Sequence, residues 1–231
     1  MAKEKHDYYL QQMGIQCWKS RDTAVNKEQV MTSEIDNASL EKPVSKLNWE
    51  ELEARVAACT LCPLLSQSRT QHVFGDGNHN ADLVIVGEAP GANEDLQGKP
   101  FVGRAGQLLT EMLKAIGLKR EDIYITNILK SRPPNNRDPK PEETANCTPY
   151  LDRQLTLIKP KLMVAVGRIA AQYLLATNET MAKLRGRTFT FRDTGTPLLV
   201  TYHPAYLLRS PGQKKEAYKD LLLIKKALET L

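Results

Sequence analysis

The sequence predicts a three-layer α/β/α sandwich around a mainly parallel sheet, and three observations lead to this prediction. First, short apolar runs alternate with amphipathic helical patterns from residue 83 to the end of the chain, as expected for strand–helix–strand units. Second, Gly117 follows one helical pattern and Pro141 opens another ahead of two glutamates, which are typical helix-end signals. Third, 231 residues with 41% hydrophobic content can bury one sizeable core.

The expected elements follow in chain order. A helical pattern over 52–57 begins the domain, close to a Cys-x-x-Cys motif. Strands are expected over 83–86, 123–128, 162–166 and 198–202, and helices over 105–116, 141–158, 168–176 and 214–228. In a sheet of this kind, ligand-binding loops follow the carboxyl ends of the strands.

The chain divides into a flexible N-terminal tail over 1–46 and one catalytic domain over 47–231. The tail is polar and charge-rich, apart from one apolar cluster at 8–18. This cluster either folds back on the domain or docks a partner protein.

Charge and cysteine content restrict the class of protein. The net charge of +5 permits a polyanionic partner. The longest apolar run, 162–166, is far shorter than the roughly 20 residues of a membrane span, and the N-terminus lacks an apolar secretion signal. The four cysteines are therefore expected to be metal ligands or free thiols of an intracellular protein rather than a disulfide framework.

Unusual polar residues follow three of the predicted strands. Glu88, Glu94 and Asp95 follow the first strand, Asn127 ends the second, and His203 follows the last. These side chains and Phe101 should converge on one pocket, because parallel strands end at the same edge of a sheet. The loop after the first strand lacks the lysine spacing of a phosphate loop, and its acids would repel a phosphate.

The candidate pocket residues each have a structural and a functional interpretation. Phe101 is either core packing or a platform for a planar ligand. Asn127 either ties down a loop or reads a ligand with one donor and one acceptor. His203 either bonds the backbone or donates to a developing anion. Taken together, an amide matches the O4 and N3–H edge of uracil and mismatches cytosine, so the pocket suits a flipped pyrimidine.

These motifs resemble those of family 4 uracil-DNA glycosylases, which carry an iron–sulfur cluster. The resemblance spans 47–231 and rests on five ordered segments, at 87–95, 98–103, 124–127, 132–137 and 203–209. It implies a hydrolase that flips uracil out of DNA and cleaves its N-glycosidic bond, which initiates base excision repair.

The resemblance also assigns roles to residues. The catalytic set is Glu88, Glu94, Asp95 and His203, and the substrate-binding set is Ala89, Phe101, Asn127 and His203. Leu207, or a neighbour, is expected to fill the stack that the flipped base leaves, and Arg209 to meet a phosphate. Lys130, Arg132 and Arg137 form a second basic loop, which either contacts DNA or is a solvated charge run.

The cysteines are the point at which the chain departs from that family. Cys59 and Cys62 alone could be a redox pair, half a zinc site or a cluster hairpin. The resemblance implies a [4Fe–4S] cluster on Cys59, Cys62 and Cys147, with Ser131 where the family has its fourth cysteine. One iron is then left to a serine oxygen, to solvent, to Cys17, or is lost. Cys17 is expected to be a bystander.

Partners and rival functions complete the expectations. The cluster at 8–18 resembles the N-terminal peptide of the psi subunit of the bacterial replicative polymerase, which implies a clamp-loader partner. We expect a monomer that acts on single- or double-stranded uracil-containing DNA. The alternatives are a glycosylase of the same superfamily with another base preference or covalent sugar trapping, and a non-catalytic iron–sulfur DNA-binding protein. The intact set of Glu88, Asn127 and His203 argues against the non-catalytic protein.

Overall fold

The computed structural model describes residues 42–231. The apolar cluster at 8–18, Cys17 and the predicted tail up to residue 41 lie outside the described residues. In the described part, no helix is long and apolar enough to cross a membrane.

A six-stranded sheet forms the centre of the described domain, in the order β1-β3-β2-β4-β6-β5. The strands are β1 (Asp76–Gly77), β2 (Leu83–Gly87), β3 (Tyr124–Asn127), β4 (Leu162–Val166), β5 (Phe189–Thr190) and β6 (Pro197–Thr201). The four inner strands are parallel, and the two short edge strands are antiparallel to their neighbours. From β2 the chain continues to β3 on one side of the sheet and then crosses to β4 on the other side of β2. Open α/β sheets bind ligands at such a switch point.

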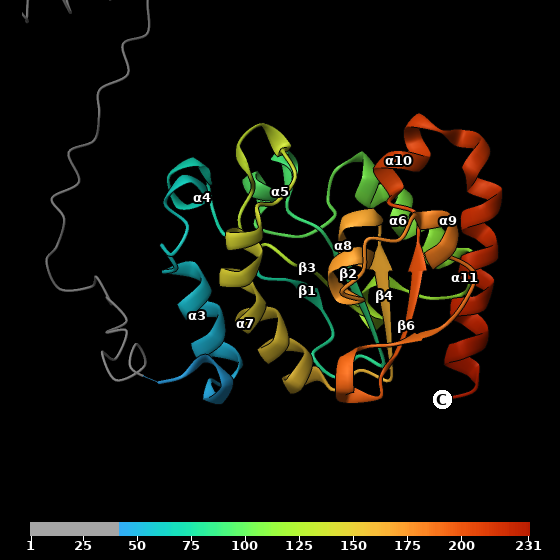
Figure 1. Ribbon diagram of the computed structural model, residues 1–231, viewed down its shortest axis with the longest axis horizontal. Coiled ribbons are helices and arrows are strands. Elements are labelled where there is room, and N and C mark those ends of the chain that lie inside the picture. Colours follow the sequence, from blue (N-terminus) through green and yellow to red (C-terminus); the bar gives the residue numbers. More distant parts are fainter. Residues whose placement is uncertain (1–41) are drawn as a thin grey trace, which may run out of the picture. The chain divides into compact units, whose positions relative to one another are not determined.

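Helices cover both faces of the sheet (Figure 1). They are α3 (Trp49–Ala57), α4 (Pro63–Ser68), α5 (Ala92–Gln97), α6 (Arg104–Lys114), α7 (Pro141–Ile158), α8 (Arg168–Leu174), α9 (Met181–Leu184), α10 (Pro204–Arg209) and α11 (Lys214–Glu229).

Alternate residues of each inner strand pack into two separate cores. Val84 and Val86 face the core under α7 and α8, whereas Leu83 and Ile85 face the core under α6 and α11. All of β2 is buried, because a parallel strand in the middle of a sandwich meets helices on both sides. The predicted three-layer architecture is confirmed.

A smaller third core attaches α3 to α7. Leu47, Leu52 and Val56 are buried there with Tyr150. The helix begins at a capping box, in which Asn48 Oδ1 accepts from the Glu51 backbone N–H, and this box stabilises the first turn. This core places α3, and with it the cysteine motif that follows, against the side of α7.

The main differences from the predicted elements lie in the loops. The segment after β2 contains the six-residue helix α5, which begins at Gly91 as its N-cap. His203 is likewise the N-cap of a short helix, α10. Both helices are too short for a clear apolar period. They nevertheless carry polar residues of the candidate site, since Glu94 lies in α5 and His203 caps α10.

Candidate active site

A pocket of about 410 Å³ opens at the carboxyl edge of the sheet, where β2, β3 and β6 end. Its lining includes most of the predicted site residues: Glu88, Ala89, Glu94, Phe101, Asn127, Arg137, His203 and Arg209. The predicted convergence of the three strand ends is therefore what the structure shows.

Phe101 is held in an unusual backbone conformation at one wall of this pocket. Its φ is 52°, in the left-handed region, and only 6% of the residue is exposed. Arg120 donates to the Phe101 carbonyl oxygen over 3.1 Å, and a Cβ on Gly106 would collide with the Phe101 backbone. Such a strained conformation persists only where its surroundings fix it, so the ring is positioned before any ligand arrives.

Asn127 ends β3 with an unsatisfied amide oxygen. The residue is 2% exposed, and its Oδ1 has no hydrogen-bond partner among the described residues. A Cβ on the paired residue Gly87 would collide with this oxygen and with the Phe101 ring. Because a buried acceptor without a donor is costly, this oxygen indicates a site for a ligand N–H beside an aromatic ring.

His203 faces Phe101 from the end of β6, with ring centroids 5.5 Å apart. Its Nδ1 accepts a hydrogen bond from the Ala205 backbone N–H over 3.1 Å. Burial lowers the pKa of His203 to about 4, and the charge of Arg209 acts in the same direction. At neutral pH the ring is thus uncharged, with its proton on Nε2 and able to donate.

Glu88 lines the same pocket and comes directly after β2. The pKa of its carboxyl is raised to about 7, mainly by burial and also by the nearby Asp138 carboxylate, while the Arg168 guanidinium opposes this shift. The Glu88 carbonyl oxygen accepts from the Leu129 backbone N–H over 3.0 Å, so the turn around Glu88 and Ala89 is tied to the end of β3. A carboxyl poised near neutrality in a cleft is typical of catalytic sites.

The other two acids of this segment have different positions. Glu94 lines the pocket, and its Oε1 accepts from the Val102 and Gly103 backbone N–H groups at 2.9 and 3.0 Å. It therefore holds the loop that carries Phe101. Asp95 is buried and accepts from the Thr70 backbone N–H; it does not line the pocket, and the structure gives it an anchoring role rather than the predicted catalytic one.

Lys130 is not a surface cation of the basic loop. It is 2% exposed and donates to Thr126 Oγ1, the Asn127 carbonyl oxygen and Gln154 Oε1 at 2.6 to 2.8 Å. Burial lowers its pKa to about 7. The predicted DNA contact is wrong for this residue, because its amino group is buried and hydrogen-bonds the end of β3 and Gln154 of α7.

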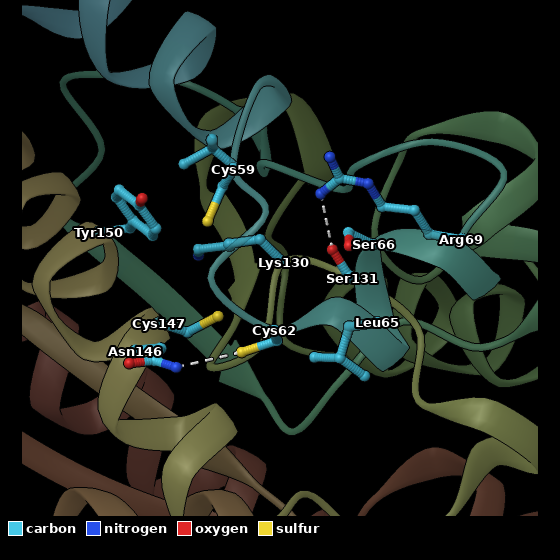
Figure 2. Close-up of a pocket in the computed structure, with 11 residues that line it drawn as sticks. Cys59, Cys62, Leu65, Ser66, Arg69, Lys130, Ser131, Asn146, Cys147 and Tyr150 are labelled. Carbon is cyan, nitrogen blue, oxygen red and sulfur yellow. Dashed lines mark hydrogen bonds between the residues drawn. The ribbon is translucent and has the colours of Figure 1, made fainter. Parts of the chain in front are cut away.

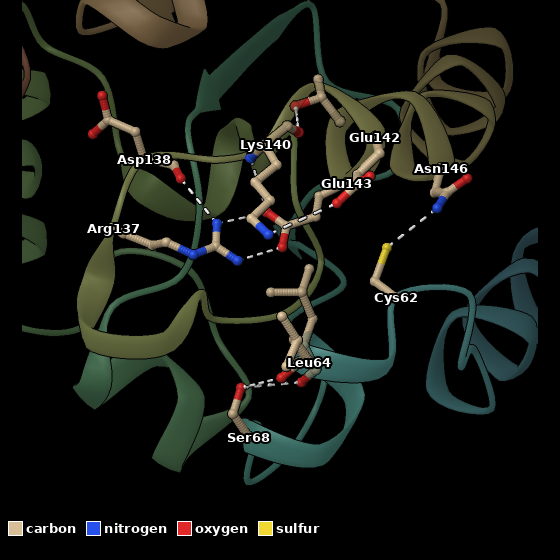
Figure 3. A network of polar contacts seen from close by, with 11 residues as sticks. Cys62, Leu64, Ser68, Arg137, Asp138, Lys140, Glu142, Glu143 and Asn146 are labelled. Carbon is tan, nitrogen blue, oxygen red and sulfur yellow. Dashed lines mark hydrogen bonds and ion pairs between the residues drawn. The ribbon is translucent and has the colours of Figure 1, made fainter.

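The two arginines of that loop are more accessible. Arg132 donates to Asn136 Oδ1 over 2.8 Å. Arg137 is half-buried, donates to Glu143 of α7 over 2.8 Å, and reaches the Asp138 carbonyl oxygen (Figure 3). Only Arg137 of the two lines the pocket.

Leu207 cannot fill a vacated base stack in this arrangement. It is 1% exposed and packs in the core beneath α6 and α11. Its neighbour Leu208 is half-buried and lines a separate surface hollow with Arg104 and Leu108. Arg209 is exposed and lines the pocket of about 410 Å³. Of the two leucines, Leu208 is the more exposed side chain, which agrees with the part of the expectation that allowed a neighbour of Leu207.

The three cysteines of the described part line a second, smaller pocket. Cys59, Cys62 and Cys147 are free thiols, and Figure 2 shows their sulfur atoms turned toward the same space. Ser131 lines this pocket too, and its Oγ accepts from Arg69 Nη1 over 3.0 Å. Within 42–231, no group of three or more His, Cys, Asp or Glu is placed to hold a single metal ion.

Two residues near the site were missed by the sequence reasoning. Asp138 and Arg168 form an ion pair of 3.3 Å, and Asp138 lines the pocket beside Glu88. Asp138 immediately follows the basic segment, and Arg168 follows the glycine at the end of β4. The position of Arg168 after a strand of the same sheet was the available signal.

Fold and site together define an α/β protein with a sheet-edge pocket suited to a planar polar ligand. An aromatic wall, an unsatisfied amide oxygen and a neutral histidine line this pocket at the switch point. Comparison with known sequences gives the family. The family described as "Uracil DNA glycosylase superfamily" matches residues 74–225.

Curated relatives make the assignment finer. The chain is 45% identical over 177 residues to a type-4 uracil-DNA glycosylase of Archaeoglobus fulgidus, covering 74% of this chain and 88% of that protein. It is 46% identical over 162 residues to a type-4 enzyme of Thermotoga maritima, covering 70% and 83%. A type-5 uracil-DNA glycosylase of Thermus thermophilus is 29% identical over 224 residues, covering 80% and 100%. The chain belongs to the uracil-DNA glycosylase superfamily, and within it to the type-4 family.

Proposed function

We propose that this protein is a uracil-DNA glycosylase, which hydrolyses the N-glycosidic bond of uracil in DNA, leaves an abasic site and so initiates base excision repair. The observation that carries this proposal is the buried, unsatisfied Oδ1 of Asn127 beside the Phe101 ring. The type-4 relatives support it, since their printed names give the same activity.

The pocket walls would read the base in two ways. Phe101 offers a face on which a flipped pyrimidine stacks, and Asn127 Oδ1 accepts from uracil N3–H while its amide N–H groups donate to O4. Cytosine has no N–H at N3 and carries a donor where uracil has O4, so both contacts would fail. An unpaired buried polar group then costs about 1–3 kcal/mol.

His203 would stabilise the leaving base. As the glycosidic bond breaks, negative charge develops on uracil, and a neutral imidazole donating from Nε2 to O2 favours that charge. The low pKa of His203 means that no proton has to be lost before the ring acts. Donation by a neutral group stabilises the uracil anion without fully protonating it.

The carboxylates would act on the sugar side. Bond cleavage leaves an oxocarbenium-like deoxyribose, which a nearby carboxylate stabilises, and water then attacks the anomeric carbon to complete hydrolysis. Glu88 is the best placed acid to orient that water, because it lines the pocket and titrates near neutral pH. Glu94 serves mainly to fix the Phe101 loop.

The DNA strand would be held by the rim of the pocket. Exposed Arg209 and half-buried Arg137 line it, and Leu208 is a partly exposed apolar side chain on α10. Removing a base from the stack exposes a gap that such a side chain fills. We expect affinity for DNA to fall with rising salt.

We infer that the cysteine pocket holds an iron–sulfur cluster, and the chemistry of its donor set supports this. The donor set is three thiols free of disulfides, Cys147 from α7 and the Cys59–Cys62 pair just before α4. Cluster irons bind separate thiolates, so the thiols need not meet around a single ion. Cys59, Cys62 and Cys147 would hold the cluster, and Ser131 occupies the fourth side. The cluster would have a structural role and would hold the Cys59–Cys62 segment against α7. A redox role is not needed, because hydrolysis of a glycosidic bond involves no electron transfer.

We further propose that the protein acts as a monomer in the bacterial cytoplasm or nucleoid, and that residues 8–18 engage a clamp-loader component. Co-purification with clamp-loader subunits tests the second point. The full chain should retain these subunits, and a chain lacking residues 1–41 should not.

One assay tests the proposed activity against its rivals. Labelled single-stranded and duplex oligonucleotides containing uracil, hypoxanthine or thymine are incubated with the protein, and abasic sites are then cleaved with alkali. Product from uracil alone supports the proposal. Product from another base indicates a different preference, a denaturation-resistant shifted band indicates covalent trapping, and retardation without product indicates a binding protein.

A further inference from the structure

The pocket of about 410 Å³ at the sheet edge is called the base pocket from here on. A second cavity, of about 630 Å³ and distinct from the cysteine pocket, adjoins it. The two share four lining residues, namely Glu88, Asp138, His203 and Arg209. The base pocket accounts for one nucleotide. DNA is a continuous chain, however, so the nucleotides on either side of a flipped uridine must cross the rim of the base pocket. The second cavity borders this rim, because the two share the four residues named above.

The walls of the second cavity have the chemistry of a nucleotide site. Two half-buried tyrosines, Tyr202 and Tyr206, line it with ring centroids 5.0 Å apart. Arg185 lies 4.0 Å from the centroid of the Tyr202 ring and ion-pairs with buried Asp220. Arg185 thereby fixes the Tyr202 ring, against which the Tyr206 ring packs.

The rim of the same cavity carries cations for a phosphate. Arg168 and Arg209 both line it and both are exposed. Arg168 is paired with Asp138 at 3.3 Å, but the two side chains are 54% and 72% exposed. Exposed pairs of this kind contribute little to stability, so the Arg168 guanidinium can exchange its partner for a phosphate oxygen.

We propose that this cavity, defined here as the neighbour subsite, binds the nucleotide adjacent to the flipped uridine, with its base against the Tyr206 ring and its phosphate at Arg168 and Arg209. This inference rests on the proposed glycosylase function and deepens it. Stacking of a base on an aromatic side chain is worth about 1–3 kcal/mol, which corresponds to roughly 5- to 150-fold in binding.

The neighbour subsite has a consequence for strand preference. In a duplex, the adjacent nucleotide must also leave its stack before it can reach Tyr206, whereas in a single strand it is already free. The subsite therefore favours uracil in single-stranded DNA, or next to a mismatch or a frayed end, over uracil in an intact duplex.

Removal of the neighbouring base from the substrate tests the proposal directly. Single-stranded oligonucleotides carry uracil with a normal thymidine on both sides, or with a tetrahydrofuran abasic analogue on the 5′ or the 3′ side. We expect kcat/KM for uracil release to fall roughly 5- to 150-fold when the base is deleted on one side only. Equal values for all three substrates, or equal losses on both sides, would overturn the proposal.

A variant series assigns the effect to the ring. Tyr206→Ala and deletion of the neighbouring base should each lower kcat/KM, and together lower it no further than the larger single effect, because both remove one contact. Tyr206→Phe should retain the full dependence on the neighbouring base. Tyr218→Ala, at an exposed tyrosine of α11, is the matched control. Additive losses would exclude Tyr206 as the partner.

The two levels of the proposal fail separately. If no oligonucleotide releases uracil, the glycosylase function itself is wrong. If uracil is released at one rate whatever its neighbour, only the subsite is wrong. Because substrate deletions need no mutation, a Tyr206 variant that fails to fold leaves the test intact.

Discussion

The Ala205 backbone N–H donates to Nδ1 of His203 over 3.1 Å, and this bond determines which ring nitrogen carries the proton. A histidine that accepts through Nδ1 must present N–H at Nε2 while it is neutral. The local turn at the start of α10 thus aims a donor into the base pocket without help from a carboxylate.

Replacement of His203 by alanine should therefore slow the chemical step. Loss of one preorganised donor to a developing anion typically costs about 10²–10³ in rate. Single-turnover release of uracil at saturating enzyme measures this step apart from product release. A His203→Ala variant within a few-fold of the wild-type rate would remove His203 from the mechanism.

The pH dependence of kcat/KM should report Glu88. Its pKa of about 7 means that the carboxylate form is lost as pH falls through neutrality, so activity should decline on the acid side. His203, with a pKa near 4, stays neutral over that range and adds no second acid limb. Glu88→Gln should be slow and flat across the same pH interval.

Two substitutions should move this acid limb in opposite directions. Asp138→Asn removes a negative charge that raises the pKa of Glu88, so the midpoint should shift to lower pH. Arg168→Met removes an opposing positive charge, so the midpoint should shift to higher pH. Shifts of the same sign for both variants would show that a group other than Glu88 titrates.

Asn127→Asp should blunt the choice between uracil and cytosine. A carboxylate cannot donate to O4 of uracil, but it can accept from the exocyclic amine of cytosine. We expect the ratio of uracil to cytosine release to fall by roughly 10- to 100-fold, in line with the cost of an unpaired buried polar group. Matched oligonucleotides that differ only in the target base give the ratio, and an unchanged ratio would argue against base reading by Asn127.

Gly87→Ala should damage the same pocket without removing any functional group. The added methyl would displace the Asn127 oxygen and the Phe101 ring, and misplacement of about 1 Å can cost 10²-fold in rate. Gly212→Ala is the control, since a Cβ there meets nothing within 4 Å. Thermal unfolding of both variants separates a lost geometry from a lost fold.

Ser131→Cys should strengthen iron binding. Four thiolates are the usual ligands of a [4Fe–4S] cluster, and the wild-type chain offers three around this pocket together with a hydroxyl that Arg69 already engages. After controlled exposure to air, we expect the variant to retain more iron and sulfide per chain than the wild type. Ser66→Ala, at another hydroxyl of this pocket, is the control; equal iron retention in all three proteins would remove position 131 from the metal site.

The sequence predicted the sheet and the pocket because both follow from simple patterns. Apolar strands such as 162–166 are read from composition alone, and parallel strands bring their ends to one edge. Thus the convergence of Phe101, Asn127 and His203 was predictable. The type-4 family, first recognised from motifs, is confirmed by the comparisons.

The errors arose where burial overrides residue type. Lys130 was expected on the surface, but three buried acceptors compensate its ammonium group. Leu207 was expected to face DNA, whereas the helical turn of α10 directs it into the core and leaves Leu208 outside. Asp95 was one acid among several, and only its bond to the Thr70 backbone N–H distinguishes it. Contacts distant in sequence contribute to two of these cases, because Gln154 accepts from Lys130 and the Thr70 backbone N–H donates to Asp95. For Leu207 the short helix α10 sets the direction of the side chain, and a helix of six residues has no clear apolar period.

The buried Lys130 couples two pockets of the molecule. It donates to the carbonyl oxygen of Asn127 over 2.8 Å and also lines the cysteine pocket, so residues 127–131 contribute to both pockets. A substitution that displaces Lys130 would therefore disturb the position of Asn127 and the cysteine pocket together.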